Sequence, residues 1–174
     1  METAQNPIDT HAIEAHRIYR YYGMLSTRFA RYHQMLMLGV AAPAVAAAVM
    51  AGVELPSAPI IAAAGIAAAT ATVAPILDYS RRAAVAASTA HLCMDLTDDW
   101  EDLWIRSINM EDHDIQLESE RLMRRLTRAT APAALQQGFY DEKLNRRADK
   151  EAKKDWNLRH DRTSTRPLAA TASS

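Results

Sequence analysis

The chain has 174 residues, a single cysteine and a formal net charge of −1. This length allows one domain with an appended tail, and the lone thiol of Cys93 excludes an intrachain disulfide framework. A net charge this close to zero indicates no particular partner, and we expect no binding to nucleic acid. The mean hydropathy of −0.23 resembles that of a soluble protein, but this average combines a long apolar stretch with two strongly charged flanks.

Residues 11–33 follow the spacing of one helix that is rich in tyrosine and arginine. Aromatic rings and arginines favour the boundary between membrane and water. The same residues are equally suited to packing against the helices that follow, and the sequence leaves both interpretations open.

Residues 35–77 form the dominant feature, because Glu54 is the only ionisable side chain among them. The stretch divides there into apolar segments at residues 35–53 and 56–77. A helix rises about 1.5 Å per residue, so each segment can cross a hydrocarbon core of roughly 30 Å. The connecting residues 54–59 include two prolines and are expected to form a tight polar turn.

A buried helical hairpin inside a soluble bundle is the main competing interpretation. A soluble surface helix needs a polar stripe that faces water. Outside the turn, Thr70 and Thr72 are the only polar side chains of the two segments, and they form no stripe. The sequence therefore predicts two transmembrane helices, with membrane lipid as their surroundings.

Small residues recur at helical spacing in both predicted spans. Close approach of helix backbones at small residues drives helix association in lipid. We therefore expect helix packing within the hairpin and between copies, in a homo-oligomer. The predicted packing seam consists of Ala41, Ala44 and Ala48 in the first span and Ala58, Ala62, Gly65 and Ala69 in the second.

Basic residues flank the spans on one side only. Arg28 and Arg31 precede the first span, Arg81 and Arg82 follow the second, and the connecting turn has neither lysine nor arginine. Loops rich in lysine and arginine stay in the cytoplasm. Both termini are therefore expected in the cytoplasm, with the turn outside.

The region after the second span continues in a helical pattern to about residue 130. Residues 95–120 are strongly acidic and residues 121–166 strongly basic. The basic helix could fold back on the acidic one, within a chain or across subunits, although two separately solvated faces are the simpler interpretation. The sequence predicts a domain at residues 11–130, a basic C-terminal helix at 131–160 and a disordered tail at 161–174. The expected fold is all-α: a transmembrane hairpin with an N-terminal helix and long C-terminal helices in a cytoplasmic helical bundle.

Residue patterns that carry chemistry are not found. His91 and Cys93 point about 200° apart on a helix, so they do not form a metal site by themselves. Glycine-rich phosphate loops and known nucleophile motifs are lacking. We expect no enzyme activity, no metal and no cofactor.

The order of parts resembles the SLATT family, the SMODS- and SLOG-associating two-transmembrane effector domains of bacteria. The stretches that carry this resemblance are residues 16–22, the hairpin, residues 78–82 and residues 91–96. The resemblance implies an effector of antiphage defence that assembles in the bacterial inner membrane and permeabilises it. It also implies a separate sensor or nucleotide-signalling partner, because the chain has no recognisable nucleotide-binding domain.

Three functions remain open at this stage. In a pore-forming effector, Thr70 and Thr72 are the candidates for the pore lining, with Glu54 at the outer mouth. A holin-like phage lysis protein would share the small size and alanine content. A membrane-anchored scaffold would use the hairpin only as an anchor.

Overall fold

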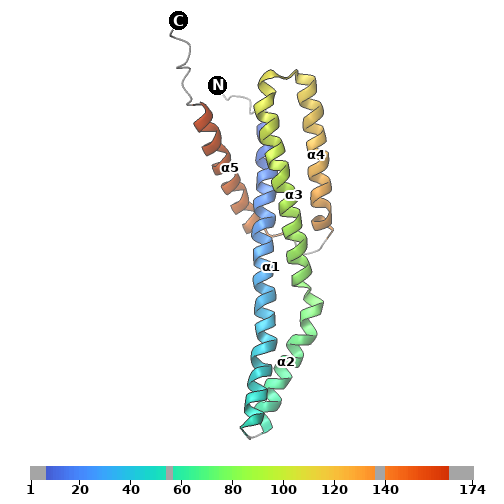
Figure 1. Ribbon diagram of the computed structural model, residues 1–174, viewed down its shortest axis with the longest axis vertical. Helices are drawn as coiled ribbons and strands as arrows, with labels where there is room; N and C mark the ends of the chain where they lie inside the picture. Colours follow the sequence, from blue (N-terminus) through green and yellow to red (C-terminus); the bar gives the residue numbers. More distant parts are fainter. Residues whose placement is uncertain (1–6, 54–56, 136–139, 165–174) are drawn as a thin grey trace. The chain divides into compact units, whose positions relative to one another are not determined.

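The computed structural model describes residues 7–53, 57–135 and 140–164, with side chains described up to Arg159. All regular elements within these ranges are helices, which confirms the predicted all-α class (Figure 1). They are α1 Pro7–Gly52, α2 Ser57–Leu77, α3 Tyr79–Arg106, the short 3-10 helix η1 Ser107–Asn109, α4 Asp112–Ala134 and α5 Glu142–Ser164.

Local sequence explains several helix ends. Pro7 occupies the first position of α1, where a backbone N–H would have no helical partner. Asp141 precedes α5, and its carboxylate accepts a hydrogen bond of 3.0 Å from the backbone N–H of Leu144, which caps that helix. Asp78 separates α2 from α3 with a positive φ of 43°, a conformation that aspartate tolerates better than most residues.

Some boundaries differ from those predicted. The helical pattern predicted to continue to about residue 130 is interrupted at η1, and α4 then continues through Pro132 to Ala134, beyond the predicted domain boundary. Proline is tolerated there because it fits helical φ and loses only one hydrogen bond in the last turn. Helix α5 reaches Ser164, beyond the predicted start of the tail at residue 161, and residues 165–174 lie outside the described residues.

The chain divides into two compact units, each with its own packing. The bundle unit combines the described residues up to Gly23 with those from Ser88 onward. The apolar unit comprises Met24–Ala87. Helices α1 and α3 each contribute one part to both units.

The bundle unit has a hydrophobic core shared by α1, α3, α4 and α5. Its centre is Trp100, which is fully buried and lies 5.5 Å, between ring centroids, from His11. Small and aliphatic side chains from α1, α3 and α4 surround it at three- and four-residue spacing, so residues 7–23 do pack against the downstream helices as expected. The core residues are Ile8, Ala12, Ala15, Cys93, Leu96, Trp100, Leu103, Leu122, Leu126, Ala129 and Trp156.

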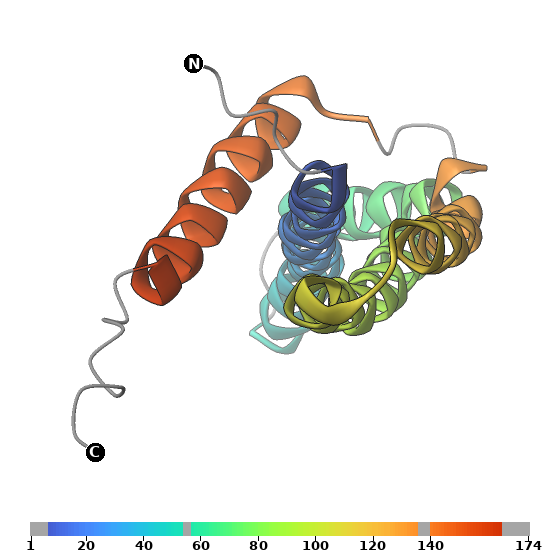
Figure 2. The same cartoon turned by 90° about the horizontal axis from the view of Figure 1, so that it is seen from above.

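Helix α5 joins this core through a narrow face and is held by polar contacts. Ala148, Ala152 and Trp156 are buried, and α5 crosses the first part of α1 obliquely (Figure 2). Around this face, Arg20 donates to Asp155 at 2.5 Å, and the Tyr21 hydroxyl accepts from the backbone N–H of Asp141 at 2.8 Å. Arg17 donates to Asn145, and Arg159 pairs with Glu101 of α3.

Candidate functional site

The apolar unit is the part of the molecule most unlike a soluble protein. Two helical regions, within residues 8–52 and 57–109, are long and apolar enough to cross a membrane by length and composition. In the apolar 18-residue stretch of the first region, only 6% is buried, and in the corresponding stretch of the second region none is buried. The core helix of a soluble protein would be mostly buried, so the competing interpretation of a buried hairpin finds no support in this chain.

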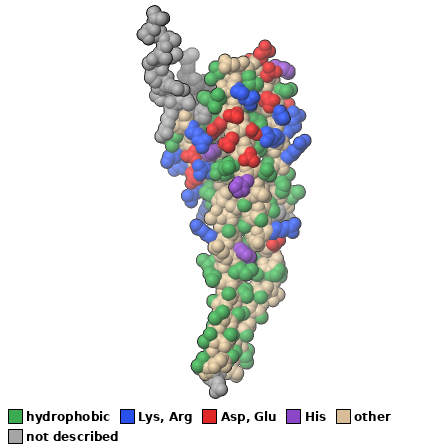
Figure 3. All heavy atoms as spheres, viewed as in Figure 1, with side chains coloured by type: hydrophobic (Ala, Val, Ile, Leu, Met, Phe, Trp, Pro, Cys, Tyr) green, Lys and Arg blue, Asp and Glu red, His purple; other side chains and the backbone are tan. Residues whose placement is uncertain are grey.

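Large apolar side chains cover the outside of both helices. Figure 3 shows α2 and the second part of α1 coated with hydrophobic and uncharged atoms, whereas the charges gather over the other elements. Met35, Val45, Ile61 and Ile76 are 71%, 63%, 68% and 76% exposed, respectively. Such a surface is unstable in water and needs a cover of lipid or protein.

A regular seam joins α1 and α2 within the apolar unit. The two helices run alongside each other in opposite directions (Figure 1), and they approach each other at Gly39. A Cβ atom added there would lie 3.3 Å from Cγ2 of Thr70. The less exposed residues recur at helical spacing: Leu36, Gly39, Val40, Pro43, Ala47 and Met50 in α1, and Ile60, Ala63, Ala67, Thr70, Ala74 and Leu77 in α2.

The seam residues predicted from the sequence lie elsewhere on the same helices. They are all exposed in the single chain, namely Ala41, Ala44, Ala48, Ala58, Ala62, Gly65 and Ala69. Both sets have helical spacing and include small side chains, so the sequence could not tell which one faces the partner helix. The structure assigns one stripe to the intrachain contact and leaves the other on the outside, where a second copy could meet it.

The predicted pore-lining residues fall in three different settings. Thr70 is half-buried against α1, whereas Thr72 is exposed. Their hydroxyls donate to the backbone oxygens of Ile66 and Ala68 at 2.9 and 2.8 Å. A threonine hydroxyl bonded to its own helix is satisfied without water. Glu54 lies outside the described residues.

An aromatic and basic belt lies at one end of this helix pair. The ring of Tyr79 stacks on Phe29 with centroids 6.0 Å apart and lies 5.5 Å from Tyr32. Arg28 donates to the Tyr32 hydroxyl at 2.8 Å and lies over the same ring. The predicted orientation-setting residues Arg28, Arg31 and Arg81 are exposed and Arg82 is half-buried. Tyrosine and arginine at one level are typical of a membrane–water boundary.

The role of Tyr79 in this belt could not be recognised from the sequence, because it follows the apolar stretch by itself. Asp78 ends α2, and Tyr79 begins α3 immediately afterwards. The left-handed backbone of Asp78 thereby brings Tyr79 beside two aromatic residues of α1. Beside the belt is a cavity of about 310 Å³ lined by residues that include His33, Met37 and Tyr79.

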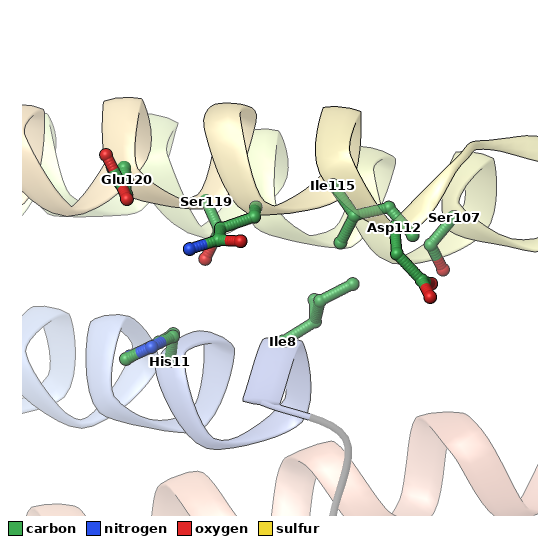
Figure 4. A pocket seen from close by; sticks show the side chains of 8 residues that line it. Ile8, His11, Ser107, Asp112, Ile115, Ser119 and Glu120 are labelled. Atoms are coloured by element: carbon green, nitrogen blue, oxygen red, sulfur yellow. The ribbon is translucent and has the colours of Figure 1, made fainter.

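A cavity lies in the bundle unit, between α1 and α4. It has a volume of about 680 Å³, and its wall includes His11, Asp112 and Glu120. Figure 4 shows Ile8 pointing from α1 towards the side chains of η1 and α4. Two carboxylates repel phosphate groups, so the cavity is poorly suited to an anionic nucleotide.

Two buried titratable groups in the bundle unit carry no reactive chemistry. Burial raises the pKa of the Cys93 thiol to about 11, so at neutral pH it remains an inert thiol. Burial lowers the pKa of His16, and the neighbouring Arg20 adds to this effect. No group of metal-ligating side chains is found among the described residues.

Comparison with known proteins identifies no relative. No protein-family model matches the chain, and neither the curated proteins nor the solved structures contain a match. The resemblance to the SLATT family therefore depends on the order of parts and on the short stretches of sequence given above.

Proposed function

We propose that this protein is an integral membrane protein whose α2 and second part of α1 cross the bilayer as a hairpin. The observation that carries the proposal is the exposure of large apolar side chains around both helices. Burying a leucine-sized side chain contributes about 1.5–3 kcal/mol, so lipid is the natural cover for this surface. The belt of Phe29, Tyr32 and Tyr79 supports the same placement, at the end where the charged residues begin.

In this proposal, the protein is a membrane-permeabilising effector of the SLATT type, and the hairpin is its membrane-spanning part. Several copies associate in the bacterial inner membrane, because two helices do not enclose a channel. The exposed small-residue stripe, which includes Ala62, Gly65 and Ala69, supports association through closely packed backbones. The bundle unit and the termini lie in the cytoplasm, where a separate sensor or nucleotide-signalling protein triggers opening. The chain itself catalyses no reaction and binds no nucleic acid.

A membrane-anchored scaffold is the second candidate. It is favoured by the half-buried position of Thr70 and by the bonding of both threonine hydroxyls to their own helix. A single hairpin consequently presents few free polar groups to line a channel.

Reconstitution into liposomes separates these functions. For an effector, purified protein at a high protein-to-lipid ratio releases a trapped dye at a basal rate without the trigger, and replacing both Thr70 and Thr72 with valine reduces this rate by several fold. The matched control replaces both Thr127 and Thr130 of α4 with valine, since their hydroxyls also bond to carbonyls of their own helix.

The outcomes have different consequences. If leakage is unchanged in the Thr70→Val, Thr72→Val variant, these residues do not line the pore. If the protein inserts tightly into the membrane and causes no leakage, the scaffold function is supported instead. A wild-type chain that is soluble and monomeric without detergent contradicts the membrane proposal as a whole.

A further inference from the structure

The acidic side chains of α3 point in three directions around the helix: towards α4, towards α5 and outward. Asp99 pairs with Arg125 of α4 at 2.6 Å, and Glu101 pairs with Arg159 of α5. Asp98 and Asp102 are exposed, and neither carboxylate has an ion-pair partner among the described residues. At 100° per residue, these two point away from the buried face that contains Trp100. Figure 3 shows acidic side chains gathered over α3 with basic ones on either side.

The outward face of α5 has the opposite charge. Its buried face contains Ala148, Ala152 and Trp156. On the opposite side of the helix, every exposed charged residue from Lys143 to Lys154 is basic. This basic face consists of Lys143, Arg146, Arg147, Lys150, Lys153 and Lys154.

The basic face of α5 is only partly neutralised within its own helix. Arg146, Arg147 and Lys153 pair with acids four residues away on the flanks of the helix. Lys150 and Lys154 have no ion-pair partner among the described residues. One chain therefore presents an unpaired acidic stripe and an unpaired basic face on different helices.

We propose that the basic face of α5 in one copy docks on the acidic stripe of α3 in the next copy, which consists of Asp98 and Asp102. The proposal rests on the membrane assembly proposed above. An isolated exposed ion pair contributes little, but membrane anchoring raises the effective concentration of neighbouring copies. Because the two surfaces differ, the contact is head-to-tail, and repetition gives either a closed ring or an open row. The charges thus order the copies through their bundle units.

Charge reversal tests this contact in the full-length protein, in detergent or in vesicles, by chemical cross-linking and sizing. One variant carries Asp98→Lys and Asp102→Lys, and the other carries Lys150→Glu and Lys154→Glu. Each variant alone is expected to lose about tenfold in cross-linked oligomer, because like charges then face each other. A mixture of the two regains the oligomer, since each chain offers what the other lacks. High salt weakens the wild-type contact.

The matched control for the α5 variant replaces Arg121 and Arg124 of α4 with glutamate, which makes the same charge change as Lys150→Glu with Lys154→Glu outside the proposed contact and leaves cross-linking at the wild-type level. Unchanged cross-linking in both test variants overturns the proposal. The proposal is also overturned if only the Lys150→Glu, Lys154→Glu variant loses the cross-linked oligomer and this variant also loses binding to phosphatidylserine vesicles or to RNA. The partner of α5 is then a lipid or a nucleic acid. Carbonate extraction of the wild type tests the membrane proposal separately, and cross-linking is measurable whether or not the chain is extracted.

Discussion

At the residue scale, Asp78 is the single residue between α2 and α3. It has a φ of 43°, and its backbone N–H donates to the carbonyl of Ala74 while its own carbonyl accepts from the N–H of Arg82. It therefore ends α2 and begins the hydrogen bonding of α3. Aspartate was visible in the sequence after the apolar stretch, but the left-handed conformation is decided by the helices on both sides.

Substitutions at Asp78 should separate backbone conformation from charge. Glycine adopts a positive φ freely, so Asp78→Gly is expected to change stability little. A β-branched side chain is strained there, and Asp78→Val is expected to destabilise the protein by about 1–2 kcal/mol. Thermal unfolding in detergent measures both. Equal losses for the two variants would show that the carboxylate, and not the backbone conformation, is what matters.

At the element scale, α1 and α2 each have two stripes at helical spacing that include small residues, one in the contact between the two helices and one on the outside. Gly39 lies at the intrachain contact, whereas Gly65 has open space around its Cβ position. The sequence presents both as glycines in apolar helices. Their different roles follow only from the rotation of each helix about its axis.

Leucine at each of these glycines should therefore have a different effect. Gly39→Leu is expected to push α1 and α2 apart at Thr70, which lowers the Tm and decreases the yield of inserted protein. Gly65→Leu leaves the hairpin intact and weakens association between copies. Thermal unfolding and cross-linking, measured on both variants, distinguish the two effects. A loss of oligomer without loss of stability in Gly39→Leu would reverse the assignment of the stripes.

The contact between α1 and α5 should depend on pH through His16. The side chain is buried, and its Nε2 lies 3.5 Å from Oδ2 of Asp155, with Arg20 bound to the same carboxylate. Burial lowers the pKa of His16, with Arg20 as the next contribution, while the hydrogen bond that the ring donates to Asp155 partly opposes this change.

The direction of the effect follows from the lowered pKa. An unfolded histidine takes up a proton near pH 6.5, whereas the folded one does so only at lower pH. Below about pH 6.5 the unfolded state binds more protons, so stability decreases as the pH falls and is fully present above this range. The Tm should fall by a few degrees between pH 7.5 and 5.5. In His16→Gln this fall should be smaller, and an equal fall would assign the effect to other groups.

At the scale of the whole molecule, the two units have opposite surface chemistry. The apolar unit exposes large hydrophobic residues and has its arginines at one end, whereas the bundle unit has a buried core and charged faces. One surface is suited to lipid and the other to water. The proposed orientation, with both termini in the cytoplasm, follows from the arginines that flank the apolar stretch.

Labelling of introduced cysteines tests this orientation. Native Cys93 is fully buried, with its pKa raised to about 11, so it contributes little background. In intact spheroplasts, a membrane-impermeant maleimide should label Ser57→Cys at the start of α2. Thr127→Cys in α4 should react only after lysis. Labelling of Thr127→Cys from outside would invert the proposed topology.

The sequence by itself determined the helical class and the two apolar segments, because composition and periodicity act over neighbouring residues. Only the tertiary structure decided which small-residue stripe of α1 and α2 forms their contact, which acids of α3 remain unpaired, and that Tyr79 stacks on Phe29. These features depend on the rotation of one helix against another. That rotation is set by contacts between residues far apart in the chain, which local periodicity does not encode.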